Sequence, residues 1–229
     1  RMIKLLVHST LFAAFIYTWF TDSKLLPAKA LLIKGQPLSR LGWLTMVDLL
    51  LQTIYHAVGV FICLLGYQKT AHRFHFIGRA LIGPLGVAVA VLFWGLYFFD
   101  PKTLAAGPEF KILIDNWPWN HGLHTLPAVS AVINVLIYRV PNPRFSCAAK
   151  TIIGFTCIYI GDVYLINHLS GGEWPYPILK HLGPIGRIVF YIFACGIFIC
   201  CFVFLSIIHK IVHGNVQCEE KKKNKQKSH

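Results

Sequence analysis

Charged side chains are scarce in this sequence, and acidic ones are the scarcest. Asp, Glu, Lys and Arg make up 14% of the 229 residues, whereas a soluble domain carries about a quarter. Hydrophobic residues make up 55%, and apolar stretches of roughly 20 residues, long enough to cross a bilayer, recur along the chain. The composition argues against a soluble domain and predicts an all-α, polytopic membrane protein.

The motifs of several familiar enzymes and metal proteins are also missing. The seven cysteines form no CxxC pair and no metal-finger spacing. There is no GxSxG elbow of the common serine hydrolases and no HExxH zinc motif. The excess of 22 Lys and Arg over 9 Asp and Glu would suggest a nucleic-acid partner in a soluble chain. Here the basic residues fall in predicted loops and in the tail, so we expect them to face anionic lipid, with no nucleic-acid partner.

The apolar stretches predict six membrane-spanning helices with both termini in the cytosol. The predicted spans are residues 3–20, 41–65, 77–99, 117–138, 148–169 and 184–208. They form one transmembrane domain over 1–209, followed by a basic cytosolic tail at 210–229 that we expect to be disordered. This orientation places most Lys and Arg residues in the cytosol. It also places all six tryptophans on the outer side, where an aromatic belt is expected.

The tail carries a possible address. It ends Lys225-Gln226-Lys227-Ser228-His229, which resembles a KxKxx retrieval signal read in the cytosol. This pattern favours the endoplasmic reticulum over the plasma membrane as the location of the protein.

Three of the predicted spans carry polar side chains at a similar depth, near their outer ends. These residues are Thr45 and Asp48; Asn120, His121 and His124; and Asp162, Asn167 and His168. Polar groups inside a span are costly without a partner and usually face the bundle interior. We therefore expect a functional site where the three spans meet. Each residue also has a structural explanation, such as a back-bond from Thr45 to a helix carbonyl.

Residue types alone leave three kinds of site open. Thr45 as nucleophile, His124 as base and an Asp or Asn that orients the base would form a hydrolase site. His121 and His124 share a helical face, and with a further histidine or carboxylate from Asp162 or His168 they would form a zinc site. A lipid-binding or transport protein would use the same polar pocket without chemistry.

Four segments resemble the androgen-induced protein family. They are LTMVDLLLQ (44–52), FWGLYFFD (93–100), WNHGLHT (119–125) and WPYPILKHLGPIGR (174–187). The resemblance implies a membrane hydrolase without a cofactor that cleaves fatty acid esters of hydroxy fatty acids. It also implies that Thr45 is the nucleophile and His124 its histidine partner.

The resemblance and the polar residues together give a detailed expectation for the site. The lipid ester would enter from the bilayer, and His124 would take the Thr45 proton and return it to the leaving alcohol. Asn120, Asn167 or His168 would donate to the oxyanion, while Asp48 and Asp162 would orient the histidine. His121 is expected to support the site rather than to act as its base. We expect the substrate pocket to be lined by Trp43, Trp94, Trp117 and Trp119.

Overall fold

Every element of the described chain is a helix. The computed structural model describes residues 1–25, 33, 36–66, 68–100, 115–214 and 216. The helices are α1 (Met2–Leu25), η2 (Pro37–Gly42), α2 (Leu44–Leu65), α3 (Gln68–Ile77), η3 (Gly78–Ile82), α4 (Gly83–Phe99), α6 (Trp117–His124), α7 (Leu126–Ile137), α8 (Phe145–Leu169), α9 (Pro177–His181) and α10 (Pro184–His213). The predicted all-α class is confirmed for this part of the chain. Most of the predicted basic tail, 217–229, lies outside the described residues.

Five helical segments are long and apolar enough to cross a membrane. They are Met2–Leu25, Leu44–Leu65, Ala71–Phe99, Phe145–Leu169 and Pro184–His213. Each overlaps one of the predicted spans, with ends that differ by a few residues. The third segment begins earlier than expected because α3, the π turn η3 and α4 follow one another without a loop.

The fourth predicted span, 117–138, is not one continuous helix. It is divided at Thr125 into α6 and α7. Pro127 has no backbone N–H to bond the carbonyl of Leu123, and the residue before a proline avoids the helical conformation. The apolar length of this segment suggested one spanning helix, but the proline interrupts it, and α7 alone has only 12 residues.

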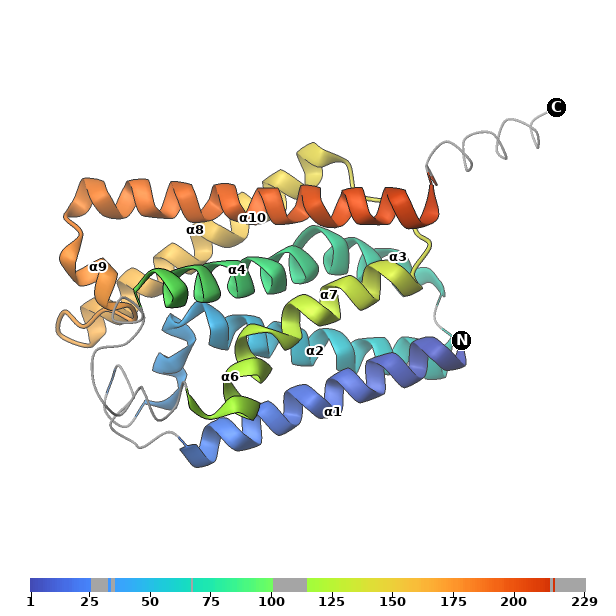
Figure 1. Ribbon diagram of the computed structural model, residues 1–229, viewed down its shortest axis with the longest axis horizontal. Coiled ribbons are helices and arrows are strands. Elements are labelled where there is room, and N and C mark those ends of the chain that lie inside the picture. Colours follow the sequence, from blue (N-terminus) through green and yellow to red (C-terminus); the bar gives the residue numbers. More distant parts are fainter. Residues whose placement is uncertain (26–32, 34–35, 67, 101–114, 215, 217–229) are drawn as a thin grey trace.

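The start of α1 and the end of α10 lie at the same end of the bundle (Figure 1). There, the Nε of Arg1 donates to the carbonyl of Cys63 at the end of α2, and His213 donates to the carbonyl of Val135 near the end of α7. We call this the basic end. The opposite end, where α2 begins directly after Trp43, is the tryptophan end. This arrangement agrees with termini on one side. Which end faces the cytosol stays a prediction.

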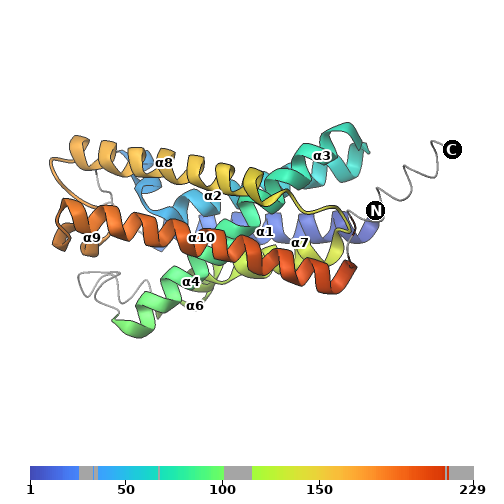
Figure 2. The ribbon, with the colours of Figure 1, turned by 90° about the horizontal axis from the view of Figure 1, so that it is seen from above.

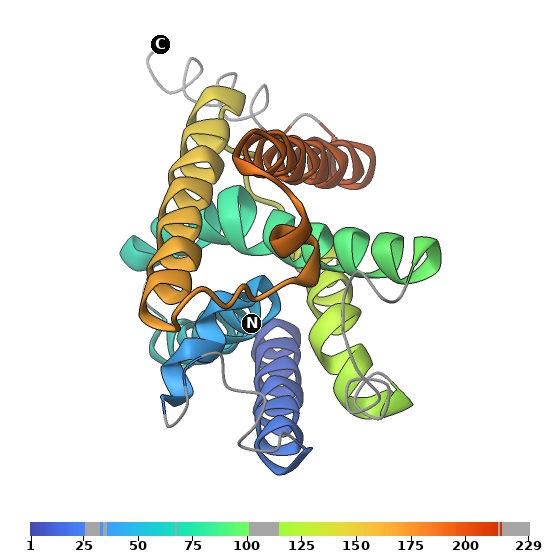
Figure 3. The same ribbon diagram turned by 90° about the vertical axis from the view of Figure 1, so that its left-hand side faces the viewer.

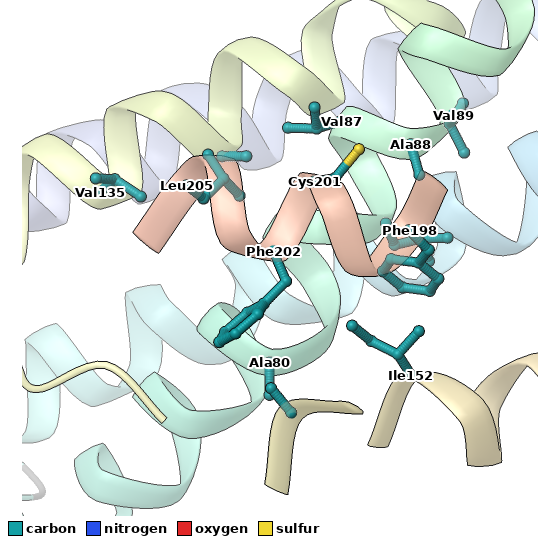
Figure 4. Packing of buried hydrophobic residues seen from close by; sticks show 13 residues of the cluster. Ala80, Val87, Ala88, Val89, Val135, Ile152, Phe198, Cys201, Phe202 and Leu205 are labelled. Carbon is teal, nitrogen blue, oxygen red and sulfur yellow. The ribbon is translucent and has the colours of Figure 1, made fainter. Parts of the chain in front are cut away.

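Helix α4 is the centre of the bundle. Looking along the bundle, it lies between α10 on one side and α1 and α2 on the other (Figure 3), while α8 and α10 run beside each other (Figure 2). In the most apolar part of Ala71–Phe99, 56% of the residues are buried, against 17% in α8. Phe198, Cys201 and Phe202 of α10 pack against Ala80 of η3 and Ala88 of α4 (Figure 4). The central helix therefore contributes most of the tightly packed core.

Two glycines let α2 and α6 pack closely against α1. A Cβ on Gly59 of α2 would collide with the ring of His8, and a Cβ on Gly122 of α6 would collide with Thr18. Small residues at such crossings let membrane helices approach closely. Gly122 lies between Asn120 and His124, so this contact also fixes the position of the predicted histidine.

Candidate functional site

An apolar pocket lies between α2, α4, α8 and α10. It has a volume of about 100 Å³, and its wall includes Thr45, Phe93, Phe155, Tyr159, Tyr176 and Tyr191. Most of the wall is aliphatic or aromatic, and the few hydroxyl groups come from Thr45, Thr156 and the three tyrosines. Pockets of this character bind apolar ligands and orient them through a few polar groups.

Thr45 reaches this pocket from the first turn of α2. It is the second residue of the helix, where the positive end of the helix dipole favours a nearby negative charge. Its hydroxyl makes no hydrogen bond to the described residues, whereas that of Thr53, two turns later, donates to the carbonyl of Leu49. Residue 41 belongs to η2 rather than α2, so a regular back-bond is not formed at Thr45. The hydroxyl is therefore uncommitted.

The segment after α8 holds the start of α2 in place. The backbone N–H of Leu44 donates to the Tyr176 hydroxyl at 2.8 Å, and the indole of Trp43 donates to the carbonyl of Pro175 at 2.7 Å. Burial raises the pKa of Tyr176 to about 12, so its hydroxyl stays protonated at neutral pH. These contacts position the residue next in the chain, Thr45.

His124 is the last residue of α6, and its ring orientation is fixed. Its Nδ1 lies 2.7 Å from the Oδ1 of Asn120 and 3.0 Å from the Asn120 carbonyl oxygen. Both oxygens are acceptors, so Nδ1 carries the proton and Nε2 keeps the lone pair that a base needs. The ring stacks face to face on Phe93, with centroids 3.4 Å apart. The orienting partner is thus Asn120, one helical turn away, and neither Asp48 nor Asp162 is bonded to the ring.

Phe93 connects the surroundings of the two predicted catalytic residues. Its ring lines the pocket together with Thr45 and stacks on His124. Within the described part of the chain, no hydrogen bond joins the Thr45 hydroxyl to the His124 ring. Phe93 thus belongs both to the pocket wall that includes Thr45 and to the stacked pair with His124.

His121 has different neighbours from His124. Its Nδ1 is 2.9 Å from the hydroxyl of Thr125, and its ring packs beside Trp94 and Trp117, with centroid distances of 5.4 Å and 5.0 Å. In the described residues, no three His, Cys, Asp or Glu side chains come together as a metal site requires. Each of the two histidines of the HxxH pattern thus hydrogen-bonds a partner of its own, Thr125 for His121 and Asn120 for His124.

The four tryptophans that were expected to line the pocket are absent from its wall. They make contacts at the tryptophan end of the bundle instead. Trp94 donates to the hydroxyl of Thr125. Trp119 donates to Asp22 Oδ1 at 2.9 Å, and Asp22 is fully buried in an ion pair with Arg40. Trp43 holds the Pro175 carbonyl, and Trp117 packs on His121. Their indole N–H groups and rings position the segments around the site.

Helix α8 contributes to the site in a different way from that predicted. Asn167 donates to the carbonyl of Glu173 in the following turn, His168 is exposed, and Asp162 is half-buried. The residue of this helix that lies at the start of α2 is Tyr159, whose hydroxyl donates to the carbonyl of Gly42 at 2.8 Å. The sequence signal for Tyr159 was weak because one tyrosine in an apolar helix is common.

Asp48 belongs to a second polar region, inside the bundle. It is fully buried, and one carboxyl oxygen accepts a hydrogen bond from Gln52 at 3.3 Å, while the other has no partner among the described residues. Gln52 also bonds the Ile82 carbonyl at 3.3 Å. Asp48 and Thr45 are three residues apart, yet they face different surroundings.

The second polar region continues through His56 to the basic end. The His56 Nε2 is 2.7 Å from the Ser130 hydroxyl, and its Nδ1 is 2.8 Å from the Nδ1 of His8. The other nitrogen of His8 is 2.8 Å from the Tyr138 hydroxyl. We define Gln52, His56, His8, Ser130 and Tyr138 as the interior polar chain. Sequence reasoning missed His8 and Ser130, although a histidine in the first span was visible as a polar residue in an apolar run.

The fold and the candidate site define a helical membrane protein with an apolar pocket that is lined in part by Thr45. The FAR-17a/AIG1-like protein family matches residues 3–210. The chain belongs to this family.

Individual relatives agree with the family match at modest identity. Human androgen-induced gene 1 protein is 28% identical over 166 residues, which cover 65% of this chain and 67% of the relative. The androgen-dependent TFPI-regulating protein of Mesocricetus auratus is 26% identical over 170 residues, 67% of this chain and 68% of the relative. A membrane protein of Schizosaccharomyces pombe is 23% identical over 171 residues, 72% of this chain and 73% of the relative. No solved structure matches the chain.

Proposed function

We propose that the protein is an intramembrane lipid ester hydrolase that cleaves fatty acid esters of hydroxy fatty acids. The observation that carries this proposal is the uncommitted Thr45 hydroxyl on the wall of an apolar pocket. His124, whose ring stacks on the pocket residue Phe93, has its Nδ1–H already fixed by Asn120. In this proposal Thr45 is the nucleophile, His124 is the base and Asn120 orients the base.

The reaction would proceed in two steps. The Thr45 oxygen attacks the ester carbonyl while His124 Nε2 takes its proton, and the same proton then passes to the departing hydroxy fatty acid. Water, deprotonated by His124, next attacks the acyl-threonine, and His124 returns the proton to Thr45 as the free fatty acid leaves. The first step requires Nε2 to reach the Thr45 oxygen in the substrate complex. We therefore expect the Phe93 ring to move when substrate binds.

Substitutions at Thr45 test the nucleophile directly. With purified protein and a branched fatty ester, Thr45→Ala should lose activity by a factor of about 10³ or more. Thr45→Ser keeps the hydroxyl and should retain measurable turnover, while Thr45→Val, nearly the same shape without the hydroxyl, should be inactive. Robust hydrolysis by Thr45→Val would end the proposal.

A matched pair of histidines tests the base. His124→Ala should be as inactive as Thr45→Ala, and the double variant scarcely worse, because both changes disable one step. His121→Ala, on the same helix with a ring of the same size removed, should keep most of the activity. If hydrolysis is lost with a strong chelator and restored by zinc, and both histidine variants are equally inactive, the metal-dependent alternative is correct instead.

A further inference from the structure

Besides that of Thr45, a second hydroxyl on the pocket wall, that of Tyr191, has no hydrogen-bond partner among the described residues. Tyr191 of α10 lies between Phe190 and Tyr164, with ring centroids 5.9 Å and 6.5 Å away. The residue is 8% exposed, and its oxygen is buried without a partner in the described structure. Buried hydroxyl groups are nearly always hydrogen-bonded, so an unpartnered one on a residue that lines a pocket is a candidate to bond a ligand there.

The two other tyrosines of the pocket differ from Tyr191 because the hydroxyl of each one hydrogen-bonds a backbone group. Tyr159 donates to the Gly42 carbonyl, and Tyr176 accepts from the Leu44 N–H. Both therefore serve to hold the start of α2. Tyr191 makes no such contact, so its O–H is available to a ligand in a pocket whose wall is mainly apolar.

We infer that the Tyr191 hydroxyl donates a hydrogen bond to the carbonyl oxygen of an acyl lipid bound in this pocket. The inference deepens the proposed function and rests on it for the choice of an acyl ligand. An apolar pocket with few free hydroxyl donors suits a long hydrocarbon chain that carries an acceptor oxygen. Thr45 lines the same pocket, so a carbonyl oxygen held by Tyr191 would keep the acyl group within the cavity that the nucleophile faces.

The inference makes an unusual prediction for the ligand-free protein. Tyr191→Phe removes a buried hydroxyl that has no partner and keeps the ring, so the melting temperature should stay the same or rise. A purely structural role for the hydroxyl predicts the opposite, a fall in melting temperature. A clear fall would therefore overturn the inference before any ligand is added.

Infrared spectroscopy tests the hydrogen bond itself. An ester with a ¹³C-labelled carbonyl is bound to Thr45→Ala protein in nanodiscs, where it cannot be hydrolysed through Thr45. We expect a carbonyl band at lower frequency than in lipid alone, and its loss in the Thr45→Ala, Tyr191→Phe double variant. Affinity should fall by about threefold to tenfold, the effect of one neutral hydrogen bond. Labelled free fatty acid, tested in parallel, should show a smaller dependence on Tyr191.

Tyr164→Phe is the matched control, since Tyr164 neighbours Tyr191 but is exposed. It should leave the shifted band intact. A band that survives Tyr191→Phe, that responds equally to Tyr164→Phe, or that depends on Tyr191 only with the free acid overturns the inference. The hydrolysis assay of the wild-type protein distinguishes a failure of this inference from a failure of the proposed function. Hydrolysis with a Tyr191-independent band refutes only this inference, whereas a Tyr191-dependent band without hydrolysis refutes only the enzyme.

Discussion

Two parts of α2 show two uses of polar residues inside a membrane protein. In its first turn, Thr45 lines an apolar pocket and its hydroxyl has no partner in the described structure. Two to three turns further along the same helical face, Gln52 and His56 are fully buried and bonded to residues of α7 and α1. Satisfied polar groups hold helices together, while uncommitted ones are available to a ligand. The difference separates stability from function along one helix, and substitutions in the two parts should separate them too.

The largest effect is expected at the candidate site, from a change of the residue that orients His124, Asn120 of α6. Asn120→Ala removes the side-chain acceptor at Nδ1, so the ring loses its fixed tautomer, and ester hydrolysis should fall about a hundredfold or more. Asn120→Asp keeps an acceptor oxygen and should recover much of the activity. Both variants should unfold at nearly the wild-type temperature. Full activity in Asn120→Ala would show that Asn120 does not orient the base.

The next effect is expected in the interior polar chain. There, a substitution should reduce stability and leave activity unchanged. His56→Leu leaves the Nδ1 of His8 and the Ser130 hydroxyl without their partner, which should lower the free energy of unfolding by about 2–3 kcal/mol. Thermal unfolding of the purified protein measures this loss. Ile54→Ala, on the exposed face of the same helix, should cost clearly less. The folded fraction of His56→Leu should hydrolyse ester at close to the wild-type rate, and a specific loss of turnover would contradict the separation.

A smaller loss is expected from a single hydroxyl of the interior polar chain. Ser130→Ala removes the bond to His56 and should lower the free energy of unfolding by about 1 kcal/mol. Thr156→Val removes a hydroxyl of α8 that only bonds back to the Ile152 carbonyl, so it serves as the control and should change stability less. Equal losses in the two variants would mean that the interior chain holds the helices no better than a local back-bond does.

The smallest effect concerns pH and the start of α2. Burial raises the pKa of Tyr176 to about 12, above the value of about 10 for a free tyrosine. Its neutral form therefore contributes stability that is fully present below pH 10 and is lost as the pH rises through 12. Thermal stability should be flat from pH 7 to 9 with respect to this group, and Tyr176→Phe should reduce the decline between pH 10 and 12. Tyr17→Phe, at an exposed position, should leave that decline unchanged.

Contacts within one helical turn were within reach of sequence reasoning. Asn120 and His124 were both selected as site residues, and their spacing of four places them on one helical face, where the structure finds them bonded. The break at Thr125 was also encoded locally, by Pro127. It was missed because the apolar length of 117–138 suggested a single span.

Contacts between helices were harder to predict, and the oxyanion and pocket candidates show why. Trp43, Trp94, Trp117 and Trp119 were expected on the pocket wall, but the aromatic wall comes from Phe93, Phe155, Tyr159, Tyr176 and Tyr191. Asn167 and His168 lie in the last turn of α8, where Asn167 bonds the following turn. A similar depth in the membrane was predicted for these residues, but similar depth does not specify which faces meet.

The sequence by itself determined the class of protein, the approximate positions of five spanning segments, the family and the candidate pair Thr45 and His124. These features depend on apolar length, on short motifs and on bonds within a turn, which are properties of consecutive residues. Only the tertiary structure decided that Phe93 stacks on His124 and lines the same pocket as Thr45, that Tyr191 lines this pocket with an unpartnered hydroxyl, and that His8 meets His56 across 48 positions of sequence. In a membrane protein the lipid-facing and buried sides of a helix are equally apolar, so hydrophobic periodicity does not reveal which side packs inward. Close packing and hydrogen bonding between helices make that choice.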